Sequence, residues 1–379
     1  MVNLKIKINV FRDSIGLQLF DRWYAYKQSL NLQKFQTNVQ VEFGLPEPDA
    51  INIAFSYLPK KSFINFDLYD FVFFDNAGES LTVATDYISQ ELVHDKAFFL
   101  CGGFLTDDHP LVSKIIPFNH NIRLMHDCMT RGFYPQYYHR LRCSYKPNKN
   151  MIFINGANRS WRRYFIDSLL QSNVSVDIKS SLGNLVIETP QCAFEDPYDS
   201  VFREQLNNLY SNATIQDYDY YNKNVKIGID EKFGQIPIGC FLIEEYYQYH
   251  CVIFPETSWI NCEHFATEKI YKCFVAGSIP FPIGGAKTHQ QYNAHGYQTA
   301  WNLLPKQLQS FDDELDHEKR YQLIVEAIAW LDNNNKIFES EQANSLRDQN
   351  QINFFKNTLD VVSVQKLDQV LRQSKKYCE

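Results

Sequence analysis

The stretch of sequence that decides the fold runs from residue 254 to residue 285 and reads FPETSWINCEHFATEKIYKCFVAGSIPFPIGG. An apolar run that ends at Phe254 predicts a buried strand, and a polar loop follows it. Thr267 is a favourable helix N-cap residue, and the residues after it predict a helix through Ala276. A second strand is expected over residues 279–283. A strand, a helix and a further strand in this order are typical of a doubly wound α/β sheet.

Two charged residues open this predicted helix. Glu268 lies in the first turn, where the helix dipole favours an anion. Lys269 opposes the dipole, and a cation at this place makes sense when it serves a bound anion. A carboxylate beside an ammonium can hold a ribose diol and a diphosphate together. The alternative is an ordinary helix start with two solvated surface charges.

The amino-terminal half alternates short apolar runs with periodic segments. Helices are expected around residues 20–24 and through 88–92. The run over 71–74 is apolar on both faces, which suits a parallel sheet covered by helices. An α/β domain is therefore predicted for this half of the chain. Its strands are expected over residues 4–10, 39–43, 51–55, 71–74 and 97–100.

A polar, proline-containing stretch over residues 143–150 predicts a domain boundary. After it the alternation restarts, with a helix expected over 160–170. The strands of this second α/β domain are expected over residues 151–154, 174–178, 251–254 and 279–283. From about residue 312 the apolar spacing becomes helical. We therefore expect domains over residues 1–145 and 146–311, and a helical segment over residues 312–379.

The composition agrees with a two-domain protein. A chain of 379 residues suits two domains of about 150–190 residues each. The mean hydropathy is −0.36, and no apolar run reaches the roughly 18 residues that a membrane helix needs. Residues 1–10 alternate like a strand and lack the features of a secretory signal. The nine cysteines are scattered without a Cys-x-x-Cys pair. We expect reduced thiols and a cytoplasmic protein, in the host cytoplasm if the chain is virus-encoded.

A segment over residues 119–149 combines basic and aromatic side chains. The whole chain has 37 Lys and Arg against 44 Asp and Glu, a net charge of −7, which opposes broad binding to nucleic acid but allows a local basic groove. Such side chains can stack a base or a sugar ring, or form an ordinary interdomain face. The predicted acceptor-binding residues of this segment are Arg140, Arg142, Tyr137 and Tyr138.

The motif in residues 254–285 resembles the α-1,3-fucosyltransferases, which form family ten of the sugar-nucleotide glycosyltransferases and have the GT-B fold. Thr267-Glu268-Lys269-Ile270 and Ile279-Pro280 match the family's Thr-Glu-Lys-Ile/Leu and x-Pro elements in order and spacing. The resemblance covers about residues 150–285. It implies two doubly wound α/β domains that face a cleft, followed by a helical carboxyl-terminal tail.

The resemblance also implies a donor-binding site. It assigns the donor ribose to Glu268 and the diphosphate to Lys269 and Arg162, with Arg163 as a neighbour able to take the place of Arg162. The remaining predicted donor-site residues are Asn155, Glu256, Thr257 and Thr267. The family reads Phe-Glu-Asn where this chain has residues 254–257 and a slightly longer loop. The resemblance therefore leaves the nucleobase and the sugar unassigned.

The activity implied is an inverting, metal-independent sugar transfer from a nucleotide-sugar donor to a glycan or another hydroxyl acceptor, with no further cofactor. The family's catalytic base is a Glu that follows a Gly near the end of an amino-terminal-domain strand, and Cys101-Gly102-Gly103 carries no acid there. A carboxylate is suited to accept the acceptor proton. We predict Asp107 or Asp108 as this base, ahead of Asp75 and Glu79.

Other interpretations stay open at this point. A viral-type glycosyltransferase acting on modified bases in DNA would share these features. So would an inactive relative that only binds a nucleotide or a nucleic acid. Asp217-Tyr218-Asp219 resembles the Asp-x-Asp metal motif of the other large glycosyltransferase fold, but it lies in a tyrosine-rich polar stretch. Because the histidines are scattered without a His-x-x-x-His pair, we expect no metal site.

Overall fold

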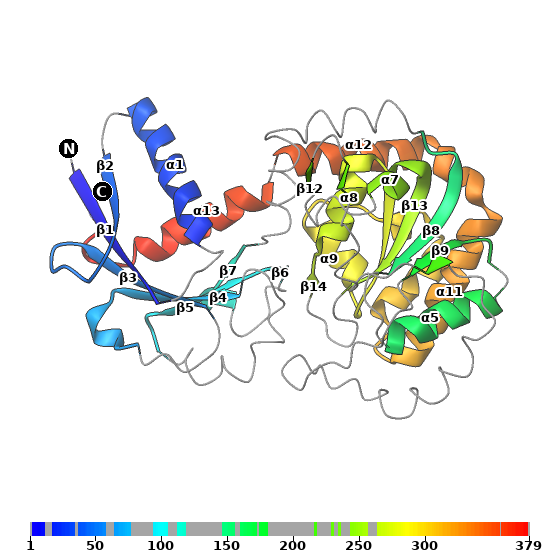
Figure 1. Ribbon diagram of the computed structural model, residues 1–379, viewed down its shortest axis with the longest axis horizontal. Helices are drawn as coiled ribbons and strands as arrows, with labels where there is room; N and C mark the ends of the chain where they lie inside the picture. The colour runs from blue at the N-terminus through cyan, green and yellow to red at the C-terminus, as the bar shows by residue number, and fades with distance from the viewer. Residues whose placement is uncertain are drawn as a thin grey trace. The chain divides into compact units, whose positions relative to one another are not determined.

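The computed structural model divides into two compact units, each centred on a parallel sheet (Figure 1). Unit 1 comprises residues 1–121, 263–266 and 357–379, and unit 2 comprises residues 122–262 and 267–356. The structure describes residues 2–11, 17–34, 37–57, 64–76, 94–104, 112–118, 146–155, 160–172, 174–180, 216–217, 229–230, 234–235, 243–256, 264–356 and 358–377. Two α/β domains and a helical carboxyl-terminal region, as predicted, are confirmed. The helical segment expected over 312–379 is divided between the two units.

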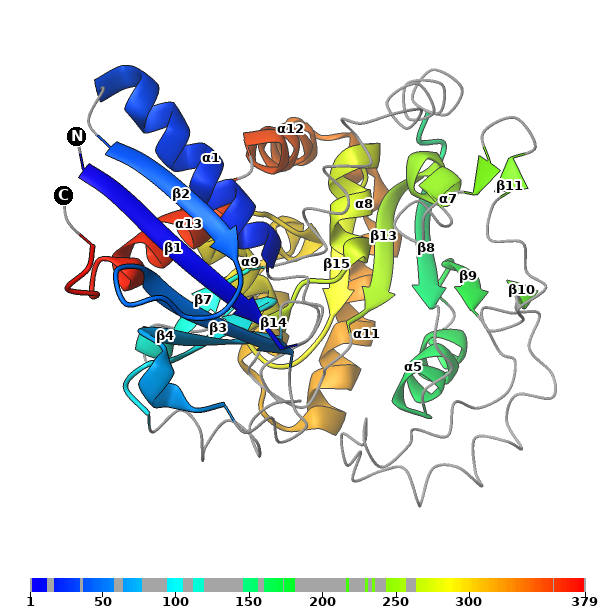
Figure 2. The same ribbon diagram turned by 60° about the vertical axis from the view of Figure 1, so that its left-hand side comes forward.

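Unit 1 contains a six-stranded sheet with the order β2-β1-β3-β4-β5-β7, in which all neighbours pair parallel (Figure 2). Its strands are β1 (Val2–Val10), β2 (Thr37–Phe43), β3 (Ile51–Tyr57), β4 (Phe71–Asn76), β5 (Ala97–Cys101) and β7 (Ile115–Pro117). A short antiparallel pair joins β6 (Gly103–Phe104) to β14 (His264–Phe265). The five strands expected in this half are confirmed. The three-residue β7 is too short to leave a periodic pattern.

Helices α1 (Leu17–Lys34) and α13 (Thr358–Leu371) contribute to the core on one face of this sheet. Phe20 and Trp23 of α1 and Leu367 of α13 are buried with the inward residues of the strands. Val72 and Phe74 belong to a separate apolar cluster, whereas Phe71 and Phe73 belong to the first. Successive residues of a strand point to opposite faces of the sheet. Both faces of β4 are buried, which explains why the run over 71–74 is apolar throughout. The remaining short helices are η1 (Phe66–Leu68) and η3 (Val112–Lys114).

One buried carboxylate ties the end of the chain to α1. Asp368 on α13 accepts hydrogen bonds from Trp23 Nε1 at 2.9 Å, Tyr377 Oη at 2.9 Å and Arg372 Nε at 2.8 Å. Lys27 Nζ lies 3.2 Å from the same group. Burial acts to raise the pKa of Asp368, but these donors and cations outweigh it and the pKa is lowered. The carboxylate is therefore held ionised within unit 1.

Unit 2 contains a five-stranded parallel sheet with the order β10-β9-β8-β13-β15. Its strands are β8 (Lys149–Asn155), β9 (Asp177–Ser180), β10 (Gln216–Asp217), β13 (Tyr249–Pro255) and β15 (Ile279–Ile283), and a separate short pair is formed by β11 (Ile229–Asp230) and β12 (Gly234–Gln235). The strand expected over 174–178 begins three residues late, because the Ser175 N–H donates to Asp332 Oδ2 at 2.8 Å instead of to the sheet.

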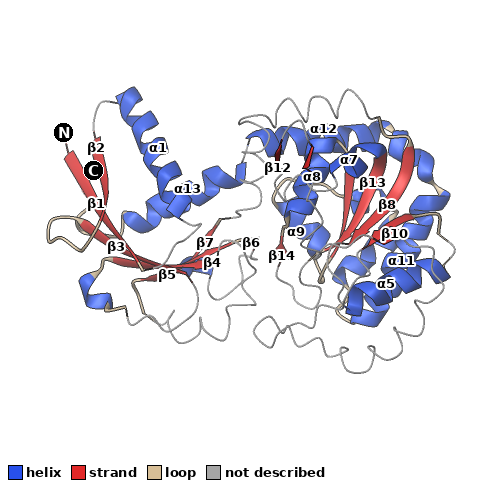
Figure 3. Ribbon diagram, in the orientation of Figure 1, coloured by secondary structure: helices blue, strands red, loops and turns tan. Residues whose placement is uncertain are grey.

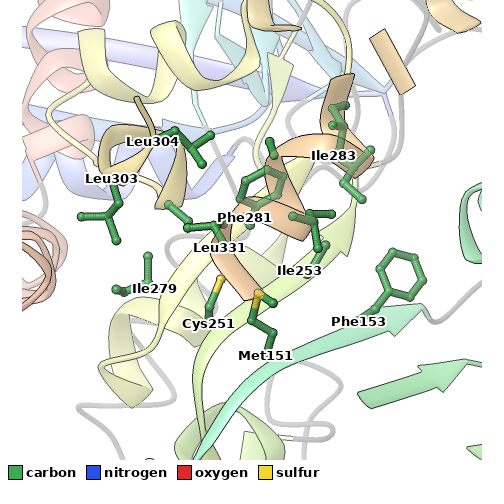
Figure 4. Packing of buried hydrophobic residues seen from close by; sticks show 14 of the residues in the cluster. Met151, Phe153, Cys251, Ile253, Ile279, Phe281, Ile283, Leu303, Leu304 and Leu331 are labelled. Atoms are coloured by element: carbon green, nitrogen blue, oxygen red, sulfur yellow. The ribbon is translucent and has the colours of Figure 1, made fainter. Parts of the chain in front are cut away.

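The core of unit 2 lies between one face of this sheet and helices α5 and α11 (Figures 3 and 4). Met151, Cys251 and Ile279 are register partners across three strands, as are Phe153, Ile253 and Phe281. Helix α8 packs against α7, α12 and β15. The helices of this unit are α5 (Ser160–Gln171), α7 (Ile243–Gln248), α8 (Glu268–Ala276), α9 (Thr288–Ala294), α10 (Lys306–Gln309), α11 (His317–Asn333) and α12 (Glu341–Lys356), with the 3-10 turns η6 (Ala300–Leu303), η7 (Ser310–Asp313) and η8 (Asn335–Glu339).

The parallel order places the carboxyl ends of β8, β13 and β15 at one edge of the sheet. In chain order β8 is followed by α5, and β13 is followed by β14 and then by α8. Ligands of open α/β sheets bind outside the carboxyl ends of the strands. This edge of unit 2 is therefore where a site is sought.

Within the ranges that the structure describes, no helix is both long enough and apolar enough to cross a membrane.

We predict that Asp368→Asn destabilises the protein by roughly 2–4 kcal/mol at pH 7, because it leaves buried donors and Lys27 without their anionic partner. The lowered pKa means that this contribution is present above the ordinary aspartate pKa and is lost as the pH falls through the folded value. Urea unfolding at pH 7 and pH 3 measures both effects. The exposed Asp49→Asn serves as the control, and an equal effect of both substitutions would contradict the assignment.

Candidate functional site

Glu256 is the centre of the polar groups at the carboxyl edge of the unit 2 sheet. It directly follows β13, and its N–H donates to the Ile283 carbonyl at 2.8 Å. The residue is only 4 % exposed. Its Oε1 accepts from Tyr292 Oη at 2.7 Å, and its Oε2 accepts from Thr267 Oγ1 at 2.9 Å. Burial raises the pKa of Glu256, while Lys269, Tyr292 and Thr267 act in the opposite direction.

Thr267 links this carboxylate to a cation. It occupies the N-cap position of α8, as predicted, but its side chain makes no capping hydrogen bond. Its hydroxyl instead donates to Glu256 and accepts from Lys269 Nζ at 3.2 Å. Both of these bonds involve a charged partner, which makes them stronger than a bond to a neutral backbone amide. Thr267 is therefore the N-cap residue, as predicted, while its hydroxyl belongs to the site.

Arg162 joins the same cluster from α5. Its Nη1 donates to Asn155 Oδ1 at 3.3 Å, and its Nη2 donates to the Glu256 carbonyl at 2.9 Å. Arg162 is 3 % exposed, and Asn155 is fully buried at the end of β8. The guanidinium thus connects α5 to the ends of both β8 and β13. Five of the predicted donor-site residues form one hydrogen-bonded cluster: Asn155, Arg162, Glu256, Thr267 and Lys269.

Glu268 lies next to this cluster in the first turn of α8 and is half-buried. Burial acts to raise its pKa, but Lys269, Lys272 and Arg162 outweigh that effect and the pKa is lowered. Glu268 is therefore ionised at neutral pH. An ionised carboxylate only accepts hydrogen bonds, which is the property needed to hold hydroxyl groups.

A second buried carboxylate anchors α9, the helix that carries Tyr292. Asp312 accepts from the N–H groups of His289 at 3.0 Å and Gln290 at 2.9 Å. Burial raises the pKa of Asp312 to about 6, against the lowering effect of these two N–H groups. Thr288 Oγ1 donates to the Gly285 carbonyl at 2.7 Å and tightens the same turn. The start of α9 is thereby held close to the end of β15.

Tyr292 and Asp312 are site residues that the sequence interpretation missed. Tyr292 lies 36 positions after Glu256, and Asp312 lies 23 positions after His289. Neither contact leaves a local spacing pattern. The only signal was the pair of glycines at 284 and 285, which marks a place of close backbone approach. A Cβ at Gly284 would lie 2.5 Å from Thr288 Oγ1, so the chain passes itself closely here.

The other predicted site residues fall in different places. Asp75 lies within β4 and not after it as expected, because the strand continues to Asn76. Arg163 lies in the first turn of α5. Asp217 is the last residue of β10. Among the residues that the structure describes, no group of three potential metal ligands occurs. The predicted residues outside the described ranges are Asp107, Asp108, Glu79, Thr257, Arg140, Arg142, Tyr137, Tyr138, Tyr218 and Asp219.

Comparison with known proteins gives remote structural likenesses. No protein-family model matches the chain, and no curated protein matches it either. A glycosyltransferase from Rickettsia africae ESF-5 has 11 % identity and a TM-score of 0.48, over 98 % of this chain and 100 % of that one. An α1,3-fucosyltransferase has 12 % identity and a TM-score of 0.36, over 100 % and 93 %. A structure described as trehalose-6-phosphate from E. coli bound with UDP-2-fluoro glucose has 11 % identity and a TM-score of 0.43, over 94 % and 78 %.

The raised pKa of Asp312 predicts a particular pH dependence. A carboxyl with a folded pKa of about 6 binds its proton more tightly in the folded state. The stability from this group is therefore fully present below the unfolded value near 4 and is lost as the pH rises through 6. Relative to Asp312→Asn, the wild type should lose up to about 3 kcal/mol between pH 4 and pH 7.

Urea unfolding of both proteins across this pH range measures the difference. Asp348→Asn, at an exposed position of α12, is the matched control and should follow the wild type. A constant difference between Asp312→Asn and the wild type from pH 4 to pH 7 would contradict the raised pKa.

Proposed function

We propose that this protein is an inverting, metal-independent glycosyltransferase that moves a sugar from a nucleotide-sugar donor to a hydroxyl group of a glycan or another acceptor. The observation that carries the proposal is the cluster at the carboxyl edge of the unit 2 sheet. It brings together two cations, Arg162 and Lys269, that lie more than 100 positions apart in the sequence.

The cations supply what a diphosphate leaving group requires. Negative charge develops on the diphosphate as the bond to the sugar breaks, and fixed positive charges stabilise it. Lys269 is half-buried, which favours a strong charge-assisted bond to a phosphate oxygen. Arg162 is hydrogen-bonded to the ends of β8 and β13. Its positive charge helps to lower the pKa of Glu268.

Glu268 is the proposed partner of the donor ribose. Its lowered pKa keeps it ionised, so it can accept from both hydroxyls of a diol. Lys269 follows it in the first turn of α8, where the helix amino end also favours a phosphate. Glu268 and Lys269 can therefore hold the ribose and the diphosphate of one nucleotide. The motif that contains Glu268 and Lys269 resembles that of the α-1,3-fucosyltransferases, and we propose a fucosyl-type donor on that basis.

The reaction itself is a single displacement. The acceptor oxygen forms a bond to the anomeric carbon while the bond from that carbon to the diphosphate oxygen breaks, with its electron pair leaving on the diphosphate. A carboxylate takes the proton of the acceptor hydroxyl. In this proposal the two cations offset the leaving-group charge that a divalent metal would otherwise offset.

We expect Lys269→Ala to weaken the binding of GDP or UDP by about 10- to 100-fold, because it removes a charge-assisted bond. Calorimetric titration in excess EDTA measures the affinity and tests metal independence at the same time. Lys306→Ala, at an exposed position of unit 2, is the control and should bind as the wild type does.

Unchanged nucleotide affinity in Lys269→Ala, with an unchanged melting temperature, would remove the basis of the proposed donor site. Binding that vanishes in EDTA and returns with manganese or magnesium would contradict metal independence. Release of nucleoside diphosphate from a sugar nucleotide distinguishes an enzyme from a pure binding protein, which releases none.

The proposed general base is a carboxylate of the amino-terminal half, Asp107 or Asp108 ahead of Asp75 and Glu79. Neutralising the base should lower the transfer rate by about 10²- to 10⁴-fold and leave donor affinity nearly intact, because the base acts on the acceptor proton. The variants Asp107→Asn, Asp108→Asn, Asp75→Asn and Glu79→Gln, assayed separately for donor binding and transfer, identify it. Normal transfer in all four would show that none of these carboxylates is the base.

A further inference from the structure

We infer that Glu256 and Tyr292 are positioning residues that hold the Lys269 ammonium in place through the Thr267 hydroxyl. The inference rests on the proposed function, since the ammonium is the proposed diphosphate ligand. Its basis is an unbroken series of hydrogen bonds from Tyr292 Oη to Glu256 at 2.7 Å, from Thr267 Oγ1 to Glu256 at 2.9 Å, and from Lys269 Nζ to Thr267 Oγ1 at 3.2 Å.

The chemistry of these groups fixes the direction of each bond. Tyr292 Oη and Thr267 Oγ1 both donate to the Glu256 carboxylate, one to each of its oxygens. The Thr267 oxygen then has its lone pairs directed elsewhere. An ammonium can only donate, and Lys269 Nζ donates to this oxygen. The carboxylate thereby orients the hydroxyl that orients the cation.

Glu256 and Tyr292 are more deeply buried than Lys269, the residue that they position. Glu256 is 4 % exposed and Tyr292 is 1 % exposed, and each oxygen of the Glu256 carboxylate accepts a hydrogen bond from a protein hydroxyl. Lys269 is half-buried. We therefore place Glu256 behind the donor site and not in contact with the nucleobase, which revises the donor-contact role that the motif implied. Its negative charge also faces Lys269, as their electrostatic interaction indicates.

The series joins three separate elements at one point. Glu256 follows β13, Thr267 precedes α8, and Tyr292 lies on α9. The Glu256 N–H also bonds the end of β15 at Ile283. A cation held in this way loses less side-chain freedom when it binds a phosphate, because part of that freedom is already lost in the folded protein. Removal of Glu256, Thr267 or Tyr292 from the series should therefore weaken nucleotide binding, although in this inference these side chains act on the nucleotide only through Lys269.

Two substitutions remove single hydroxyls from this series. Tyr292→Phe and Thr267→Val should each weaken GDP or UDP binding on the order of tenfold or more, since the first breaks one hydrogen bond of the series and the second breaks two. Thr267→Ser keeps the hydroxyl and should restore the affinity that Thr267→Val loses. Tyr271→Phe is the control for removing a buried phenol, because the Tyr271 hydroxyl has no hydrogen-bond partner among the residues that the structure describes. Melting temperatures show which variants are folded.

The deciding experiment repeats Tyr292→Phe and Thr267→Val in a Lys269→Ala background, with GDP and UDP affinities measured by calorimetry. If the hydroxyls act through Lys269, they have no further effect once it is absent. Equal losses in both backgrounds, or wild-type affinity in Tyr292→Phe and Thr267→Val, would overturn the inference. If Lys269→Ala alone leaves affinity unchanged, the proposed function fails instead. Should Tyr292→Phe not fold, the comparison of Thr267→Val with Thr267→Ser carries the test.

Discussion

The site depends on one constraint, the need of the buried Glu256 carboxylate for hydrogen-bond donors. A carboxylate that is 4 % exposed is costly to bury without partners. Its two oxygens accept from the hydroxyls of Thr267 and Tyr292. The backbone carbonyl of Glu256 accepts from Arg162, and its N–H donates to the Ile283 carbonyl. The side-chain and backbone hydrogen bonds of Glu256 together join β13, α5, α8 and α9. The positions of Arg162 and Lys269 follow from that arrangement.

Much of the fold was predictable because most of its strands and helices have a local apolar pattern in the sequence. The strands over 51–55, 97–100 and 279–283 and the helix over 160–170 all appear within a few residues of the expected bounds. Each is an apolar run or periodic segment bounded by polar residues, and such signals survive in a single sequence. The strand expected from residue 174 begins only at Asp177, because the Ser175 N–H bonds Asp332 on α11, a contact that no local pattern reveals.

The site was predictable only as far as its motif reached. Glu268 and Lys269 stand out as charges at a helix start, and Arg162 follows a strand and a loop. Tyr292 and Asp312 could not be found in this way, because their contacts span 36 and 22–23 positions and depend on the tertiary fold. The assignment of α13 to unit 1 has the same cause. Its partner α1 lies at the other end of the chain, where Trp23 and Lys27 meet Asp368.

The most direct test is a crystal structure of the protein with GDP or UDP, whichever binds more tightly. We expect the diphosphate at the carboxyl edge of the unit 2 sheet, with a phosphate oxygen within hydrogen-bond distance of Lys269 Nζ and the ribose hydroxyls at Glu268. The bonds from Tyr292 and Thr267 to Glu256 should be retained. A nucleotide bound at another edge or in unit 1, with no phosphate contact to Lys269, would contradict the account.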